Sequence, residues 1–437
     1  MTLVETRRNM KKKIFNAVWL ILLAVSCLVL LASCGNNTAK FFDYSQDDLG
    51  PIGKLVYLMH NNWIGNYGWT VVVFTVFLKI LMLPLDFWQR YSSRKSSLKM
   101  QRIQPLIESI DKRYGANTQR ANEEKQKLYK KQGYSMASMC LPMILSMVIF
   151  FVMFGGLRNY STYSSITSFQ ELLGVYHETY VEQIKKSPET QDVYNVYKAE
   201  YEKLLDEEKS DKNNDALAKV NLQTKIIAEA KQLRPAACSE FEQNALKTVQ
   251  KYYEEHHESW LWIQNVWQPD TWATIMQPYS GGSFGGGGFG ATIDMSGYTG
   301  DPEAIYNLIR NAVLETGGYG NNGTWNGLML LPFLSIGLSF LSMFISQQLE
   351  KKNRNGEMVQ QNQQQAATNK TMMIVMPLMM AWFGFIYTGA FAIYMVVNYA
   401  ISIISTLALR WPVEKVVLRK LDKEERKNQS SKASYMR

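Results

Sequence analysis

Long apolar runs alternate with charged stretches along this chain of 437 residues. An α-helix needs about 20 mostly apolar residues to cross the hydrocarbon core of a bilayer. Five stretches have that character, in addition to an apolar run near the N-terminus. They are residues 69–88, 136–157, 328–347, 371–387 and 390–409. The pattern predicts an all-α polytopic membrane protein with five core transmembrane helices.

The run near the N-terminus has a different character. Five Lys and Arg residues lie within residues 7–13, and an apolar run over residues 14–31 follows them, which is the order found in secretory signals. The tetrapeptide Leu-Ala-Ser-Cys that ends at Cys34 resembles a bacterial lipobox. Residues 1–33 are therefore predicted to be a lipoprotein signal peptide, with Cys34 as the site of lipidation by palmitate or a similar acyl chain. An uncleaved membrane anchor is the alternative, because the apolar run is long for a signal peptide.

Composition alone would suggest a soluble basic protein, with a mean hydropathy of −0.19 and a net charge of +9. The charges are segregated, however. Residues 89–135 hold 12 Lys/Arg and 4 Asp/Glu, and residues 350–370 and 410–437 are also basic, whereas residues 159–325 hold 13 Lys/Arg and 23 Asp/Glu. Since cytoplasmic loops carry the excess of Lys and Arg, the basic stretches are expected inside the cell and the acidic one outside. This places the N-terminus outside and the C-terminus in the cytoplasm.

Six parts follow from these patterns. They are the signal peptide (1–33), an extracytoplasmic N-terminal segment (34–68), the first two spans with a cytoplasmic helical hairpin between them (69–158, hairpin 89–135), an enlarged extracytoplasmic region with a Gly-rich loop (159–326), the last three spans with a cytoplasmic loop (327–410, loop 350–370), and a basic cytoplasmic tail (411–437). The hairpin is expected because apolar residues such as Leu98 and Ile103 recur at helical spacing. The clearest helices of the extracytoplasmic region are expected over residues 194–208 and 215–233.

The first span contains a lysine that is costly in a membrane. Lys79 follows Trp69 by ten residues, or about 15 Å of helix, so it is expected near the centre of the bilayer. A charge there costs about 2.5–3.5 kcal/mol and usually faces a wet cavity with a function. Thr75 lies one turn earlier on the same face. A lysine that snorkels to the headgroups, or a structural link from Lys79 to Asp86, is the alternative.

Other spans offer polar groups without charge, such as Tyr394 and Asn398, which lie four residues apart on one face of the fifth span. Such residues more often hold helices together than bind substrates. Together with Lys79 they are expected to line one hydrophilic groove. The candidate groove residues are Lys79, Thr75, Ser146, Met147, Tyr394 and Asn398.

Motifs for other chemistry are weak or missing from the sequence. The chain has no G-x-x-x-x-G-K-[ST] nucleotide-binding motif, and the match to G-x-S-x-G lies in a glycine tract over residues 281–288, where a flexible loop is the plainer interpretation. His256 and His257 have no Cys or further His at ligand spacing, and a surface pair is expected. We predict that the protein is not an enzyme and needs no cofactor or metal.

Several short motifs along the chain form a set. They are Thr75-Val76-Phe77-Leu78-Lys79 with Leu83-Pro84-Leu85, Met100-Gln101-Arg102-Ile103-Gln104-Pro105, Lys112-Arg113-Tyr114-Gly115, Cys140-Leu141-Pro142-Met143, Leu261-Trp262-Ile263 with Pro269-Asp270, Met376-Pro377-Leu378-Met379, and Tyr394 with Asn398. The set resembles the YidC family of membrane protein insertases. The chain departs from the family pattern by Lys79 in place of arginine, Ser146 and Val148 in place of glutamine and proline, and Met395 in place of tryptophan, and it has an enlarged outer region.

The resemblance implies a protein of the bacterial plasma membrane that inserts and folds other membrane proteins, alone or with the Sec translocon. Its implied partners are nascent membrane proteins, membrane lipids, and the ribosome through the basic tail and the hairpin. An ion-coupled transporter or channel that uses Lys79 is the main alternative. A transporter usually shows paired repeats with broken spans, and none is visible here. A lipoprotein whose outer domain binds partners is a second alternative.

Overall fold

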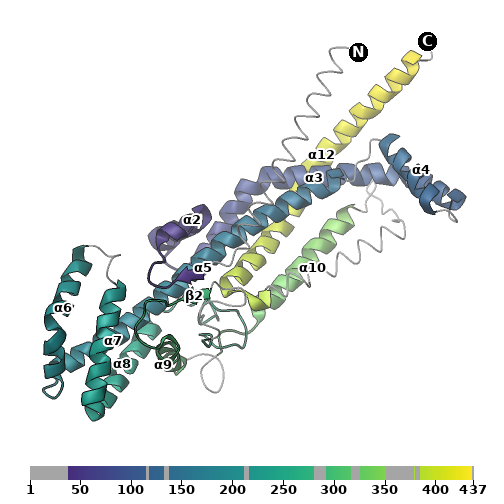
Figure 1. Cartoon of the computed structure of the whole chain (residues 1–437). Coiled ribbons are helices and arrows are strands. Elements are labelled where there is room, and N and C mark those ends of the chain that lie inside the picture. Colours follow the sequence, from purple (N-terminus) through teal and green to yellow (C-terminus); the bar gives the residue numbers. More distant parts are fainter. Residues whose placement is uncertain are drawn as a thin grey trace. The chain divides into compact units, whose positions relative to one another are not determined.

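The structure is a computed structural model, shown in Figure 1. It describes residues 38–114, 118–131, 137–210, 216–279, 292–315, 325–350, 378 and 384–435. Four predicted features lie outside the described residues, wholly or nearly so. They are the signal peptide with Cys34, the Gly-rich loop at 281–288, the cytoplasmic loop after residue 350, and the fourth span apart from its C-terminal end.

Helices make up most of the described chain, which confirms the all-α prediction. Within the described residues, three helices are long and apolar enough to cross a membrane: α3 (Tyr67–Tyr114), α10 (Leu330–Glu350) and α12 (Gly389–Tyr435). They contain the first, third and fifth predicted spans. The second predicted span lies in α5 (Ala137–Lys186), in which the side chains of residues 137–147 are outside the described part.

The remaining elements are short helices and two strands. In chain order they are β1 (Thr38–Lys40), η1 (Gln46–Asp48), α2 (Pro51–Met59), η2 (His60–Ile64), α4 (Thr118–Lys131), α6 (Gln191–Ser210), α7 (Ala216–Leu233), α8 (Pro235–His256), β2 (Thr292–Asp294) and α9 (Pro302–Leu314). β1 and β2 pair in parallel, with Ala39 opposite Ile293. The helices predicted over 194–208 and 215–233 correspond to α6 and α7.

The described residues fall into two compact units. The first unit comprises the residues up to Val71, those of Phe151–Pro332 and those of Phe383–Ile393. The second comprises Val72–Phe150, Phe333–Trp382 and Tyr394–Arg437.

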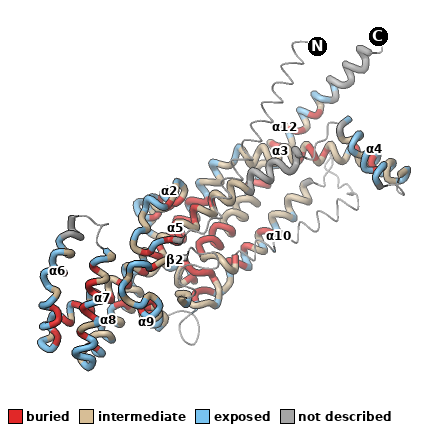
Figure 2. Tube along the Cα trace, viewed as in Figure 1, coloured by how far each residue is buried: buried red, intermediate tan, exposed pale blue. Residues whose placement is uncertain are grey.

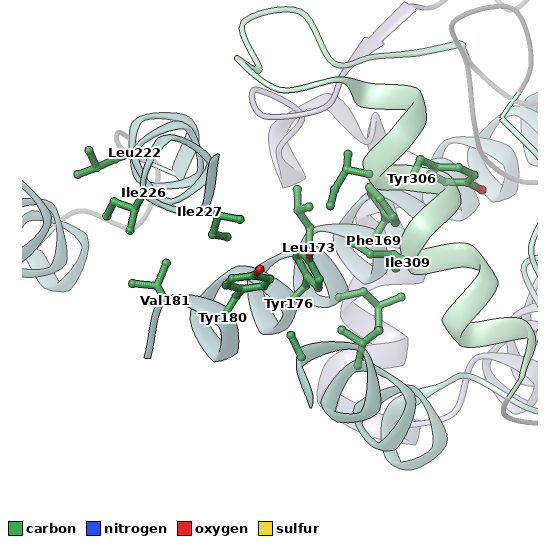
Figure 3. Close-up of a cluster of buried hydrophobic side chains, with 14 of the residues drawn as sticks. Phe169, Leu173, Tyr176, Tyr180, Val181, Leu222, Ile226, Ile227, Tyr306 and Ile309 are labelled. Carbon is green, nitrogen blue, oxygen red and sulfur yellow. The ribbon is translucent and has the colours of Figure 1, made fainter. Parts of the chain in front are cut away.

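The core of the first unit forms around the C-terminal part of α5. Phe169, Leu173, Tyr176 and Tyr180 recur at helical spacing and are at most 2% exposed, which gives α5 one apolar stripe. Side chains from α7 and α9, such as Ile309, complete the core (Figure 3). Figure 2 shows the buried positions on α5, α7, α8 and α9 in red. The acidic and strongly polar region of residues 159–325 thus forms a core because its apolar residues share one face of each helix.

His177 is buried beside this core, and burial lowers its pKa to about 4 from an ordinary 6.5. Its Nε2 lies 3.3 Å from Thr224 Oγ1. The folded protein keeps the imidazole neutral, whereas the unfolded chain takes up a proton once the pH falls below its ordinary pKa. Stability is therefore fully present above about pH 6.5 and is lost as the pH falls toward about 4, by about 3 kcal/mol at most.

We expect His177→Gln to remove this part of the pH dependence. The measurement is hydrogen–deuterium exchange of α5 and α7 in the full-length protein in nanodiscs, at about pH 7 and about pH 5. The wild type should lose protection at the lower pH more than the variant does. Equal losses in the two proteins would show that His177 does not cause the effect.

The second unit contains the predicted hairpin. Its first arm is not a separate helix, since α3 continues from the first span to Tyr114 without interruption. The second arm is α4. Ile103 and Ile107 of α3 are buried against Leu128 and Tyr129 of α4, and an ion pair joins Lys125 to Asp111. The first arm of the hairpin and the first span therefore belong to one helix, which contains Pro84 and Pro105.

α12 likewise continues beyond its apolar part. The sequence predicts a basic tail from residue 411, and the structure shows that this tail is the last part of α12. Leu98 of α3 is buried together with Val413, Val417 and Leu421 of α12. The first half of the tail is therefore a packed helix against α3 rather than a free segment.

Candidate functional site

The candidate groove centres on Lys79, which is partly buried in α3 of the second unit. Its Nζ donates a hydrogen bond of 3.1 Å to the Oγ of Ser402 on α12. Among the described residues Lys79 forms no ion pair with Asp86, so the structural link considered from the sequence is not seen. The hydrogen-bond partner of the ammonium group is thus a neutral oxygen rather than a carboxylate.

The other groove residues occupy different settings. Thr75 is buried one turn before Lys79, at 1% exposure. Tyr394 is buried, with its ring centroid 6.3 Å from that of Phe150. Asn398 is partly buried and lies one turn before Ser402 on the same face of α12. Ser146 and Met147 belong to α5, but their side chains are outside the described part.

Sequence reasoning missed Arg90 as a groove residue. Its Nη2 donates hydrogen bonds to the backbone oxygen of Ser402 at 3.4 Å and to Ser405 Oγ at 3.1 Å. Arg90 follows Lys79 by eleven residues, which is about three turns of helix, so spacing alone puts both cations on one face. This spacing did not identify Arg90 as a groove residue, because Arg90 lies beyond the apolar run and belongs to the basic stretch of the hairpin.

One turn after Arg90 on α3, the next cation, Arg94, has a carboxylate partner. Arg94 donates two hydrogen bonds to the carboxylate of Glu414, at 2.7 Å from Nε and 2.8 Å from Nη2. Such a bidentate pair has fixed geometry and compensated charge. Lys79 and Arg90 therefore have neutral hydrogen-bond partners on α12, whereas Arg94 ties α3 to α12 through a carboxylate.

In the first unit, Asp270 is a fully buried carboxylate that caps the start of α10. Its Oδ1 accepts hydrogen bonds from the backbone N–H of Leu328 and Met329, and its Oδ2 accepts from Leu331 N–H and Trp262 Nε1, at 2.8–3.2 Å. The first N–H groups of a helix have no partner within the helix, and a negative charge there is stabilised by the helix dipole.

Two neighbours hold Asp270 in this position. A Cβ on Gly327 would lie 2.0 Å from Asp270 Oδ1, so only glycine fits there. The side-chain amide of Asn326 donates to the backbone oxygens of Asn265, Gln268 and Pro269. These contacts connect positions about 60 residues apart in the sequence and fix the loop before Asp270 against the chain that enters α10.

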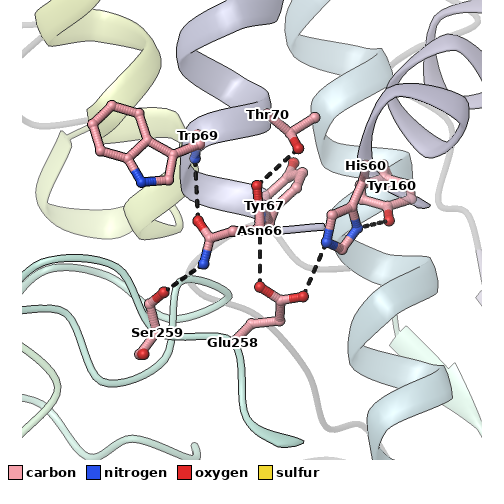
Figure 4. Close-up of polar contacts among 8 residues, drawn as sticks. All are labelled: His60, Asn66, Tyr67, Trp69, Thr70, Tyr160, Glu258 and Ser259. Carbon is pink, nitrogen blue, oxygen red and sulfur yellow. Dashed lines mark hydrogen bonds and ion pairs between the residues drawn. The ribbon is translucent and has the colours of Figure 1, made fainter. Parts of the chain in front are cut away.

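The same loop, residues 258–270, also contacts the first residues of α12 and α3. The N–H groups of Gly389 and Ala390 donate to the backbone oxygens of Gln268 and Val266. At the start of α3, Glu258 accepts a hydrogen bond from Tyr67 N–H, and its Oε1 lies 3.0 Å from Nε2 of His60 in η2 (Figure 4). One loop therefore ties the first residues of α3, α10 and α12. The sequence pointed to it only through the motif around Trp262 and Asp270.

These features define the class of protein. It is an all-α, membrane-integral protein whose first and fifth spans meet through two cations and neutral serine oxygens. The family model described as 60Kd inner membrane protein matches residues 59–197 and 244–415, which is more than half of the chain. The chain belongs to that family.

Several relatives with similar sequences are named membrane protein insertase YidC. The chain is 40% identical over 114 residues to the one from Caldanaerobacter subterraneus subsp. tengcongensis, which is 26% of this chain and 53% of the relative. It is 37% identical over 111 residues to the one from Endomicrobium trichonymphae, or 25% and 21% of the two chains. It is 32% identical over 135 residues to the one from Prosthecochloris aestuarii, a match that covers 30% of this chain and 22% of the relative. The matches thus span about half or less of each relative. They confirm the family that the motifs predicted.

The family match omits residues 198–243. These residues include part of α6, all of α7 and the start of α8. The sequence predicts an enlargement in this region, and the structure shows that its described residues form helices whose apolar side chains join the core around α5.

Proposed function

We propose that this protein inserts and folds other membrane proteins in the bacterial plasma membrane, alone or beside the Sec translocon, and without a nucleotide. The observation that carries this proposal is the contact of Lys79, within a membrane-spanning helix, with the neutral hydroxyl of Ser402. A charge kept inside a span without a carboxylate partner is available to a charged substrate. The named activity of the relatives supports the same function.

In the proposed mechanism, Lys79 attracts the acidic tail of a client protein into the groove. The hydroxyls of Thr75, Tyr394 and Ser402, the amide of Asn398, and water lower the free-energy cost of removing that tail from bulk solvent. The apolar span of the client then moves into lipid, and burial of its surface drives the reaction. The membrane potential contributes about 2.3 kcal/mol per charge and 100 mV.

Charge segregation supports the proposed placement in the membrane. The acidic region of residues 159–325 lies outside the cell, and the hairpin and the end of α12 lie in the cytoplasm. A lipid on Cys34 anchors the N-terminus outside. The hairpin and the basic end of α12 receive nascent membrane proteins and contact the ribosome and the anionic lipid surface. No observation favours an ion-coupled transporter or a channel.

Reconstitution tests this function. The purified full-length protein is placed in liposomes without other proteins, and a small client with one apolar span and an acidic tail is synthesised in their presence. Protection of the client tail from added protease reports insertion. We expect protection to require the protein and to persist after nucleotide is removed from a completed translation. Equal protection in liposomes that lack the protein would contradict the proposal.

A further inference from the structure

Two cations of α3 converge on one residue of α12. Lys79 Nζ contacts the hydroxyl of Ser402, and Arg90 Nη2 contacts its backbone oxygen. The Cα atoms of the two cations are separated by about 16 Å along an α-helix. Both side chains nevertheless reach the same serine, so they extend toward each other along α3. The result is a pair of positive charges focused on a single turn of α12.

The described hydrogen-bond partners of Arg90 are all neutral oxygens. Ser402 and Ser405 offer neutral oxygens, whereas Arg94 on the next turn has the carboxylate of Glu414. The Nε of Arg90 is buried and has no hydrogen-bond partner among the residues that the structure describes. Asp86 is close enough to interact electrostatically with Arg90 and Lys79, but in the described chain it forms an ion pair with neither.

A guanidinium with a buried, unused N–H group is suited to a carboxylate. Arginine binds carboxylates through two parallel hydrogen bonds, which lysine cannot do. An unpaired buried donor also costs free energy until a partner arrives. The neutral contacts of Arg90 can be exchanged for a carboxylate, whereas those of Arg94 already involve one.

We propose that Arg90 is a second client-binding cation, which rests on the proposed insertase function. Arg90 lies on the hairpin side of Lys79 in α3, so a client tail arriving from the hairpin meets Arg90 first. Arg90 binds one carboxylate of that tail and Lys79 binds another. The pair therefore favours clients whose translocated tail carries two acidic residues over clients with one.

The test uses the full-length protein in liposomes with two clients that differ only in having two aspartates or one aspartate in the tail. We expect Arg90→Gln to slow insertion of the two-aspartate client by about tenfold and that of the one-aspartate client by about twofold or less. Arg90→Lys should restore only part of the rate for the two-aspartate client, because lysine keeps the charge but not the two parallel hydrogen bonds. Equal effects of Arg90→Gln on the two clients would overturn the proposal.

A charge exchange separates binding from a structural role. Arg90→Glu should insert the two-aspartate client poorly and regain insertion when the one aspartate that meets position 90 is changed to lysine, while the aspartate that meets Lys79 is kept. A variant that has merely lost its fold would fail with both clients, so the fold of Arg90→Glu is checked by gel filtration and circular dichroism. If the variant is well folded and still fails with both clients, the proposal is overturned. The double variant Arg94→Gln with Glu414→Gln is the matched control, because it removes an already compensated pair. It should leave the preference for two aspartates unchanged.

The same experiments separate the role of Arg90 from the insertase function on which it rests. If the wild type inserts neither client, the insertase function itself fails. If the wild type inserts both, Lys79→Ala impairs both and Arg90→Gln shows no client preference, only the role of Arg90 is refuted.

Discussion

Replacement of Lys79 by alanine is expected to reduce insertion of an acidic-tailed client by about tenfold or more, whereas Lys79→Arg should retain it. In the low-dielectric interior of a membrane protein a single charge acts strongly on an approaching carboxylate. Alanine leaves only neutral hydroxyls, which lower the desolvation cost without attracting the charge. Arginine keeps the charge, and its longer side chain can still reach Ser402.

The measurement is complementation in cells from which the native protein can be depleted. Wild type, Lys79→Ala and Lys79→Arg are expressed at equal levels, and insertion of a small acidic-tailed client is followed by protease accessibility. Ser402→Ala is the matched control, because it removes the hydrogen-bond partner of Lys79 and keeps the cation. It should reduce insertion far less than Lys79→Ala does. Full insertion by Lys79→Ala would refute the electrostatic mechanism.

The membrane spans could be predicted because their signal is local. A helix in lipid must be apolar over about 20 residues, and the runs that contain Lys79 and Asn398 satisfy this wherever they pack. The helical hairpin was also predictable from the spacing of Leu98 and Ile103. Its continuity with the first span was not, because a change from apolar to charged residues looks like the end of an element even where the helix runs on.

That same change of composition hid Arg90. Hydropathy marks where the lipid-soluble part of α3 ends, but long cationic side chains reach back along the helix from beyond that point. Its partners Ser402 and Ser405 lie more than 300 residues away in the sequence. No local pattern shows such a pairing. Lys79 was found because an apolar run contains it, and a charge in such a run needs an explanation.

The role of Asp270 depends on contacts of the same long-range kind. Its sequence neighbours place it in a short motif, but its four hydrogen-bond donors include three N–H groups just before and within the first turn of α10, about 60 residues later. Capping residues usually precede their helix directly. A cap supplied by a distant loop is visible only once the chain is folded.

Asp270→Ala is therefore expected to destabilise the start of α10 severely, by about 4 kcal/mol. The change removes a buried acceptor of four hydrogen bonds and leaves the N–H groups of Leu328, Met329 and Leu331 without it. Hydrogen–deuterium exchange of the full-length protein in nanodiscs measures this directly. The amides of these three residues should lose their protection in the variant, and the protein should unfold at a lower temperature.

Asp301→Ala provides the matched control. Asp301 caps α9 by accepting hydrogen bonds from the N–H groups of Glu303 and Ala304, but it is exposed. Water can replace an exposed cap, so its loss should cost only about 1 kcal/mol. The comparison isolates burial, since both variants remove an aspartate cap. Equal destabilisation by the two changes would show that the buried network around Asp270 adds nothing beyond ordinary capping, and that its loop does not hold α10 in place.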